Sequence, residues 1–266
     1  MSLTKLAIKI AAPLPKIENY ERFLFIGPHP DDIEIGAGAT AAKLASAGKK
    51  ICFLICTDGR YGDAVLKTAH PEWTPEELAD RTARIREQEC RASAAYLGVE
   101  DVRFLRLSDG GFYDFAEMAK DIAQTVSDFK PDVIFAPDPN SKSESHIDHL
   151  NTGRAAGQIA CFAPYEGIMR QYGESITAAP VQAIAYYMTA RPNQKVSTTG
   201  FLQRQMGALK NCHLSQYPKG GKEFDSIELY LKLRSAEYGI KCGHRAAEAF
   251  RVLGQTHMHC LPEAGE

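Results

Sequence analysis

Several features that would assign this 266-residue chain to a specialised class of protein are absent from it. Lysine and arginine number 31 against 33 acidic residues, and no basic stripe predicts binding to nucleic acid. No apolar run approaches the roughly 18 residues that a membrane span needs. The N-terminal stretch 7–14 is short and contains Lys9 and Pro13, so it does not resemble a signal peptide. We therefore expect neither a nucleic-acid partner nor a membrane span.

The cysteine pattern excludes a disulfide-stapled scaffold. The count is odd and the spacings match neither a disulfide framework nor a zinc-knuckle pattern. The seven cysteines are Cys52, Cys56, Cys90, Cys161, Cys212, Cys242 and Cys260. Small thiols in apolar stretches are commonly buried in the core. We read them as structural thiols in a reducing, cytoplasmic compartment.

The pattern of apolar runs predicts one α/β domain over residues 1–266. Strand and helix patterns alternate, which favours a mostly parallel, Rossmann-like sheet with helices on both faces. The Rossmann-like core is expected over about 20–190, followed by a helical and strand extension over about 191–266. Strands are expected at 22–27, 51–56, 102–105, 133–136, 181–188 and 249–253, and helices at 35–47, 75–97, 115–129, 149–162, 198–211 and 223–238.

Two short clusters of histidine and carboxylate each follow an expected strand. The first is Pro28-His29-Pro30-Asp31-Asp32 and the second is His146-Ile147-Asp148-His149. In open parallel sheets, binding sites form at the carboxyl ends of the strands near the switch in strand order. Both clusters are therefore expected at the same edge of the sheet, where they could share one metal ion.

The residue types divide into ligands and acid–base groups. A hydrolytic zinc site needs about three protein ligands and one open position for water. His29, Asp32 and His149 are the candidate ligands. The neighbouring carboxylate, Asp31, is placed to act as a general base.

Two further residues have supporting roles in this interpretation. His146 could donate to a developing oxyanion or protonate a leaving group. Asp148 could orient a histidine by accepting a hydrogen bond from its ring. A plainer interpretation remains open for each cluster. An Asp-Asp pair often caps a helix, and a His-x-x-His at a helix start is often solvated.

The stretch Gly36-Ala37-Gly38-Ala39-Thr40 is similar to a dinucleotide-binding fingerprint but is a poor match. Its glycines follow the acidic turn and not the strand itself, and a third glycine is missing. The carboxylates of Asp31 and Asp32 would also repel a pyrophosphate. The favoured explanation is that these glycines allow a helix to pack closely below the turn that contains the first cluster.

Taken together, these motifs resemble the LmbE-like or PIG-L family of zinc deacetylases. The resemblance runs through most of the chain, and the two clusters are its specific part. The remaining matches are Gly36 to Thr40, Thr57-Asp58-Gly59, Arg86-x-x-Glu89, Leu97-Gly98-Val99, Pro131-Asp132-Val133 and Ala247-Glu248-Ala249-Phe250-Arg251. Ala136 to Pro139, Glu144 to His149 and His213 to Pro218 are most similar to the diacetylchitobiose deacetylase branch.

The resemblance implies zinc bound by His29, Asp32 and His149, Asp31 as the base, and His146 as the oxyanion donor. It also implies a sugar pocket lined by Arg86 and Asp109. Such relatives are homo-oligomers, so a trimer or hexamer is expected here. A tail histidine of a neighbouring subunit then enters the site; His259 is the better match and His257 the rival. Arg60 follows the second strand and is expected to touch substrate.

The expected activity is removal of an N-acetyl group from an N-acetylglucosamine-type sugar, with release of acetate. One rival is a metal-dependent hydrolase of another bond, such as a phosphoester or an amide or ester in a thiol–sugar conjugate. Another is a sugar-binding relative that has lost activity. The intact Asp31 argues against pure binding, which needs no base.

Overall fold

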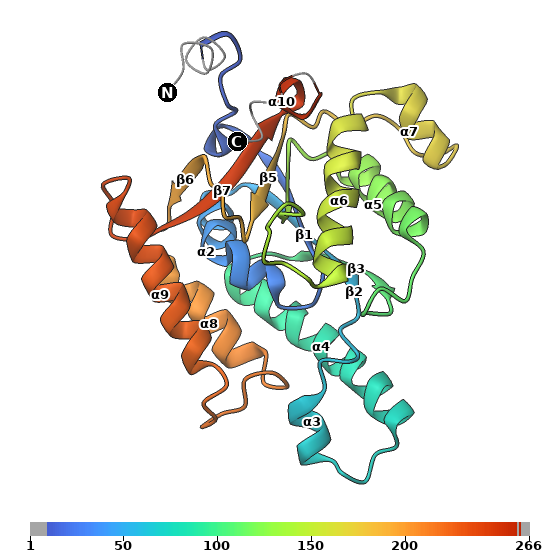
Figure 1. The fold of residues 1–266 in the computed structure, drawn as a ribbon, viewed down its shortest axis with the longest axis vertical. Coiled ribbons are helices and arrows are strands. Elements are labelled where there is room, and N and C mark those ends of the chain that lie inside the picture. The colour runs from blue at the N-terminus through green and yellow to red at the C-terminus, as the bar shows by residue number, and fades with distance from the viewer. Residues whose placement is uncertain (1–9, 260, 262–266) are drawn as a thin grey trace.

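The computed structural model describes residues 10–259 and residue 261, and it contains a seven-stranded sheet between two layers of helices (Figure 1). The strand order is β3-β2-β1-β4-β5-β7-β6. Of the sequence features discussed above, Cys260 and the start of the stretch 7–14 lie outside the described residues. All cysteines inside them are free thiols.

The first five strands are parallel, as predicted. They are β1 (Arg22–Gly27), β2 (Lys50–Thr57), β3 (Asp101–Leu107), β4 (Val133–Pro137) and β5 (Ala183–Tyr187). Phe25 of β1 lies in register with Phe53 and Phe135, and the rings of Phe25 and Phe135 stack with centroids 4.2 Å apart. The central strands are buried on both faces, which explains their continuous apolar sequences.

The predicted C-terminal extension contributes strands to the same sheet. β7 (Ala247–Gly254) pairs antiparallel with β5, and β6 (Gln194–Ser197) pairs antiparallel with β7. β7 agrees with the strand expected at 249–253. β6 was not predicted, because a four-residue edge strand that reads Gln-Lys-Val-Ser carries little hydrophobic signal.

Helices cover both faces of the sheet. One face packs against α2 (Asp32–Ser46), α4 (Pro75–Leu97) and α8 (Leu202–Cys212), and the other against α5 (Phe115–Phe129), α6 (Ile147–Phe162) and α7 (Glu166–Tyr172). α9 (Asp225–Ile240) lies along β7 (Figure 1). The remaining elements are η1 (Ile17–Asn19), α3 (Ala64–Ala69) and α10 (Gln255–His259).

Two helices begin earlier than the sequence predicted, and both begin at a cluster of interest. α2 starts at Asp32 and not at residue 35, and α6 starts at Ile147 and not at residue 149. Asp31 and His146 occupy the N-cap positions. The side chains of both clusters are thus fixed by the first turn of a helix.

The strand order explains why the two clusters meet. The chain moves outward from β1 through β2 to β3, then crosses back to β4 on the other side of β1. The carboxyl ends of β1 and β4 flank this switch point, where open α/β sheets bind ligands. Among the described residues, no helix is both long enough and apolar enough to cross a membrane.

Candidate metal centre

The first cluster is a tight turn between β1 and α2. The carbonyl of Pro28 accepts hydrogen bonds from the backbone N–H and the hydroxyl of Thr57, each at 2.8 Å. The backbone N–H of His29 donates to Asp32 Oδ2 at 3.0 Å. This local bonding directs the side chains of His29 and Asp32 toward each other across the turn.

The candidate ligands converge although His149 lies more than a hundred residues away from the other two. His29 Nδ1 lies 2.9 Å from Asp32 Oδ2, and His149 Nε2 lies 3.4 Å from the same oxygen. The metal-binding atoms of the three residues all lie within 4.8 Å of one another. Two imidazoles and one carboxylate are a donor set that suits zinc with an open position.

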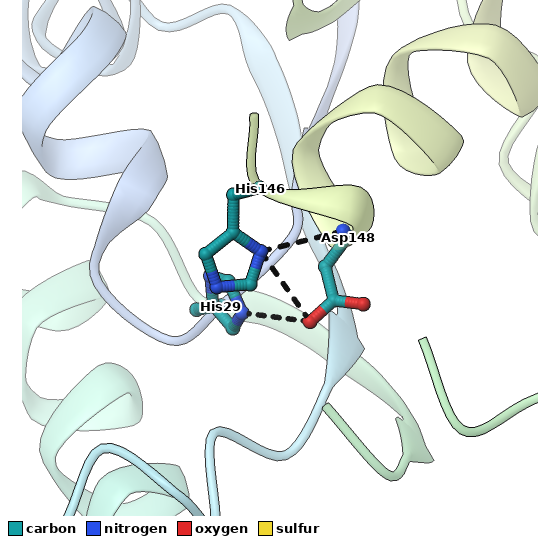
Figure 2. Close-up of side chains that lie close together, drawn as sticks. All are labelled: His29, His146 and Asp148. Carbon is teal, nitrogen blue, oxygen red and sulfur yellow. Dashed lines mark hydrogen bonds and ion pairs between the residues drawn. The ribbon is translucent and has the colours of Figure 1, made fainter. Parts of the chain in front are cut away.

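Asp148 lies beside His29 and contacts its ring, as Figure 2 shows. Its fully buried carboxylate is 3.2 Å from His29 Nε2 and accepts the backbone N–H groups of Gly110 and Gly111 at 2.6 and 2.9 Å. A carboxylate on one ring nitrogen fixes the tautomer and leaves the other nitrogen free to bind a metal. The contact between Asp148 and His29 is the geometry that the predicted orienting role requires.

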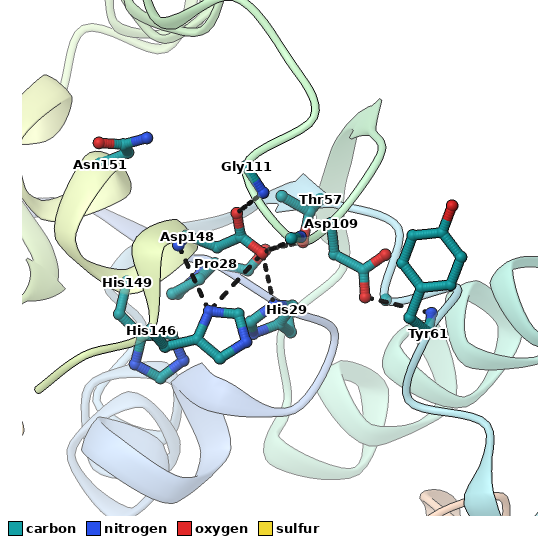
Figure 3. A network of polar contacts seen from close by, with 12 residues as sticks. Pro28, His29, Thr57, Tyr61, Asp109, Gly111, His146, Asp148, His149 and Asn151 are labelled. Carbon is teal, nitrogen blue, oxygen red and sulfur yellow. Dashed lines mark hydrogen bonds and ion pairs between the residues drawn. The ribbon is translucent and has the colours of Figure 1, made fainter.

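His29, His146 and Asp148 form a second group with the geometry to hold an ion. The oxygens of Asp148 are already occupied by two backbone N–H groups and by His29 (Figure 3). Asp32 Oδ1, in contrast, has no hydrogen-bond partner among the described residues. The donor set His29, Asp32 and His149 is therefore the better fit.

His149 has a carboxylate behind it that the sequence did not reveal. Its Nδ1 lies 3.0 Å from Glu144 Oε2. Glu144 precedes α6 in a polar loop, where nothing in the sequence distinguishes it from a solvated residue. Each candidate histidine ligand thus has one nitrogen near Asp32 and the other near a second carboxylate.

The electrostatics of the site favour a positively charged occupant. Burial opposes ionisation, but contacts with His149 and His29 hold the pKa of Asp32 well below its usual range. Burial lowers the pKa of His29, yet Asp148 and Asp32 outweigh it and raise that pKa to about 10. Burial raises the pKa of Asp148, but hydrogen bonds from His29 and Gly110 bring it down to about 2.

Asp31 occupies the N-cap position of α2 without capping it. Its side chain accepts no bond from the helix and instead pairs with Arg86, whose Nη2 lies 2.8 Å from Asp31 Oδ1. Both side chains are buried, and Arg86 also donates to the carbonyl of Gly59 at 3.0 Å. Asp31 is therefore a carboxylate beside the site and not a helix cap.

His146 lies at the mouth of the site, with half of its side chain exposed. Its Nδ1 accepts the backbone N–H of Asp148 at 3.3 Å. Burial, followed by the nearby rings of His29 and His149, lowers its pKa. A neutral ring that accepts at Nδ1 carries its proton at Nε2, so His146 has a donor to offer.

The residues expected to touch substrate have different surroundings. Asp109 is buried, accepts the N–H of Tyr61 at 3.2 Å (Figure 3), and has a pKa raised by burial. Arg60 is half-buried and pairs with Asp58 at 2.7 Å. Arg86 lies behind Asp31, as described above.

The two tail histidines differ in their contacts and in their exposure. His257 contacts the carbonyl of Ala12 through Nε2 at 3.0 Å and accepts the N–H of Gly254 at Nδ1. His259 ends α10 with an exposed side chain.

The chain is similar in sequence to a family of deacetylases. Residues 24–160 match the family model described as "PIG-L: GlcNAc-PI de-N-acetylase". The diacetylchitobiose deacetylase of Thermococcus kodakarensis is 31% identical over 98% of this chain and 93% of its own length. A 1D-myo-inositol 2-acetamido-2-deoxy-alpha-D-glucopyranoside deacetylase of Acidothermus cellulolyticus is 26% identical over 81% of this chain and 89% of its own.

A solved structure is similar over nearly the whole fold. The N,N'-diacetylchitobiose deacetylase of Pyrococcus horikoshii, in complex with an inhibitor, superimposes with a TM-score of 0.84. It is 28% identical, and the match covers 98% of this chain and 97% of that chain.

Proposed function

Because this chain belongs to the PIG-L family, we propose that it is a zinc-dependent hydrolase that removes an N-acetyl group from an N-acetylglucosamine-type sugar. The observation that carries the proposal is the convergence of His29, Asp32 and His149. Beside them lies the carboxylate of Asp31, which is not part of the donor set and is paired with Arg86. Relatives along most of the chain are named as deacetylases of N-acetylated sugars. An intact base beside a metal site favours hydrolysis over binding alone.

His29, Asp32 and His149 would hold the ion, and Asp148 would keep His29 in the required tautomer. The carboxylate of Glu144 lies 3.0 Å from His149 Nδ1 without forming a hydrogen bond to it. A bound zinc ion supplies a Lewis acid and lowers the pKa of water from 15.7 toward about 7. With three protein ligands, a zinc ion held here would still be able to bind water, as hydrolytic zinc sites require.

Asp31 would move the proton. Its carboxylate accepts a proton from water as the water oxygen bonds to the acetyl carbon. Asp31 then passes this proton to the amide nitrogen as the carbon–nitrogen bond breaks, so the sugar leaves as an amine. The acetic acid formed loses its own proton and is released as acetate. Arg86 keeps Asp31 in place through a buried ion pair and prevents it from turning toward the helix N-terminus.

His146 would stabilise the negative charge on the acetyl oxygen. Its Nε2 proton is available because Nδ1 already accepts the N–H of Asp148. A well-aimed donor of this kind is worth roughly 3–4 kcal/mol in the transition state. Asp109 and Arg60 lie on the loops around the site and are assigned to sugar binding.

The proposal includes a homo-oligomer, a trimer or hexamer, in which His259 of one subunit completes the site of another. His259 is exposed, whereas His257 is engaged within its own chain. A reducing compartment such as the cytoplasm agrees with the free thiols of the described cysteines.

Release of acetate across a substrate panel tests this function. The panel contains N-acetylglucosamine, N,N'-diacetylchitobiose, a thiol conjugate of N-acetylglucosamine and a phosphate monoester. We expect acetate and free amine from at least one N-acetylated sugar. Phosphate release alone would assign the site to phosphoester hydrolysis, and sugar binding without any turnover would identify an inactive relative.

A further inference from the structure

A cavity separate from the candidate metal centre lies between α6, the β5–β7 strand pair and α10, in the region where these elements approach one another in Figure 1. It is an open cleft of about 500 Å³, and it shares no residue with the candidate metal centre. Arg154, Gln158, Tyr186 and Arg251 contribute polar atoms to its wall, with Phe162 and Leu253 beside them. No aspartate or glutamate of the described chain lines it.

Arg251 is a buried cation without a counter-ion. Only 7% of the residue is exposed, yet its guanidinium forms no hydrogen bond or ion pair with any residue that the structure describes. Buried arginines are almost always paired, because an isolated charge is costly to remove from water. Arg251 lines the cleft, so its side chain borders that space.

Tyr186 is a second buried polar side chain without a hydrogen-bond partner among the described residues. It lies directly opposite Arg251 on the neighbouring strand, so both side chains project from the same face of the sheet. It is 6% exposed, and its hydroxyl has no partner within the described residues. The nearest carboxylate that influences it, Asp138, is already bound by Thr189 and by the N–H of Asn140.

The opposite wall of the cleft packs closely against the Tyr186 hydroxyl. A Cβ atom at Gly157 of α6 would lie 2.3 Å from the Tyr186 hydroxyl. Arg154, one turn earlier on the same helix, is exposed and also has no partner among the described residues. The cleft thus contains two guanidinium groups and a phenol donor, and no carboxylate of the described residues pairs with them.

We propose that this cleft binds a small oxyanion, such as a carboxylate or a phosphate group, held by Arg251 and Tyr186 with Arg154 at the rim. A guanidinium binds a carboxylate or a phosphate group through two parallel hydrogen bonds, and both Arg251 and Arg154 line the cleft. The apolar side chains beside it would contact the carbon skeleton of an organic acid or ester. The inference does not rest on the proposed deacetylase activity.

Calorimetric titration of the purified protein with inorganic phosphate and with acetate, in Tris–chloride buffer at constant ionic strength, tests the site. We expect saturable binding of at least one anion, one per chain, and at least a tenfold loss of affinity in Arg251→Met. Tyr186→Phe should weaken binding by a smaller factor. Arg170→Met removes an equal charge from α7, outside the cleft, and should bind like the wild type.

Two further measurements distinguish anion binding by Arg251 from a purely structural role of this residue, and binding at the cleft from binding at the metal centre. In chloride buffer, Arg251→Met should melt no lower than the wild type, and phosphate should raise the melting temperature of the wild type only. His149→Ala, which lacks a proposed metal ligand, should keep the cleft site. The proposal is overturned by equal binding in Arg251→Met, by absence of saturable binding of both anions, or by a lower melting temperature of Arg251→Met in chloride.

Discussion

Asp31 and Asp32 are neighbours in the chain, but their surroundings give them different chemistry. Asp32 contacts two histidines, and Asp31 contacts a buried arginine on α4. One carboxylate therefore belongs to the donor set for a cation. The other keeps an oxygen available for proton transfer.

Asp31→Asn tests this division. The amide cannot accept a proton from water, so acetate release should fall by about 10²–10⁴-fold, the usual contribution of a general base. Zinc content should stay at the wild-type level because the donor set is unchanged. Elemental analysis and the acetate assay are run on the same sample, and near-wild-type turnover would remove Asp31 from the role of base.

His149→Ala removes one of the three candidate ligands and should abolish stoichiometric zinc. His146→Ala is the matched control: it deletes an imidazole from the same turn but should keep zinc while turnover falls. The metal content of both variants is measured after dialysis against metal-free buffer. Full zinc occupancy in His149→Ala would exclude that residue as a ligand.

At the scale of elements, the loop after β3 supports the site. The N–H groups of Gly110 and Gly111 hold Asp148, and both glycines have positive φ values, 85° and 83°. A Cβ atom at Gly111 would also lie 2.9 Å from the side chain of Ile147 at the start of α6. The loop and the helix therefore have to fit closely for Asp148 to reach His29.

Gly111→Ala should consequently weaken metal binding about 10–100-fold, as is usual when the partner of a metal-binding histidine is disturbed. Gly48→Ala is the matched control, since Gly48 also has a positive φ, 74°, but no atom lies within 4 Å of its Cβ position. Competition with a chromophoric chelator measures both affinities. Equal zinc affinity in the two variants would show that the loop does not support the site.

The sequence predicted most of the elements, and it did so where one local signal dominates. β1 was predicted at its observed bounds because it is a short apolar run followed by a Pro-rich turn. The start of α4 was marked by the capping box of Thr74 and Glu77, which the structure contains. α2 was predicted three residues too late, because the acidic pair Asp31-Asp32 was assigned to the turn after β1, whereas the helix begins at Asp32.

The sequence indicated which residues meet but not which atoms face each other. Parallel strand order was enough to bring His29 and His149 to one edge of the sheet. The pairing of Asp31 with Arg86 joins residues 55 positions apart, and that of His29 with Asp148 joins residues 119 apart. No local pattern encodes such contacts, and for the same reason Glu144 was missed.

For the whole molecule, the open question is whether neighbouring subunits share a site. If His259 of one subunit completes another subunit's site, then His259→Ala and Asp31→Asn should each have low activity. Unfolding and refolding the two variants together should restore part of it, because some mixed sites carry both native residues. Full activity in His259→Ala alone would contradict a shared site.

A zinc-dependent N-deacetylase must lose its activity with its metal and regain it with zinc. The most direct test is acetate release from N,N'-diacetylchitobiose by protein stripped with a chelator and then titrated with zinc. We expect no acetate without metal, and a rate that rises linearly until one zinc per chain is bound. A rate independent of zinc, or no acetate from this sugar or from N-acetylglucosamine at full occupancy, would contradict this activity.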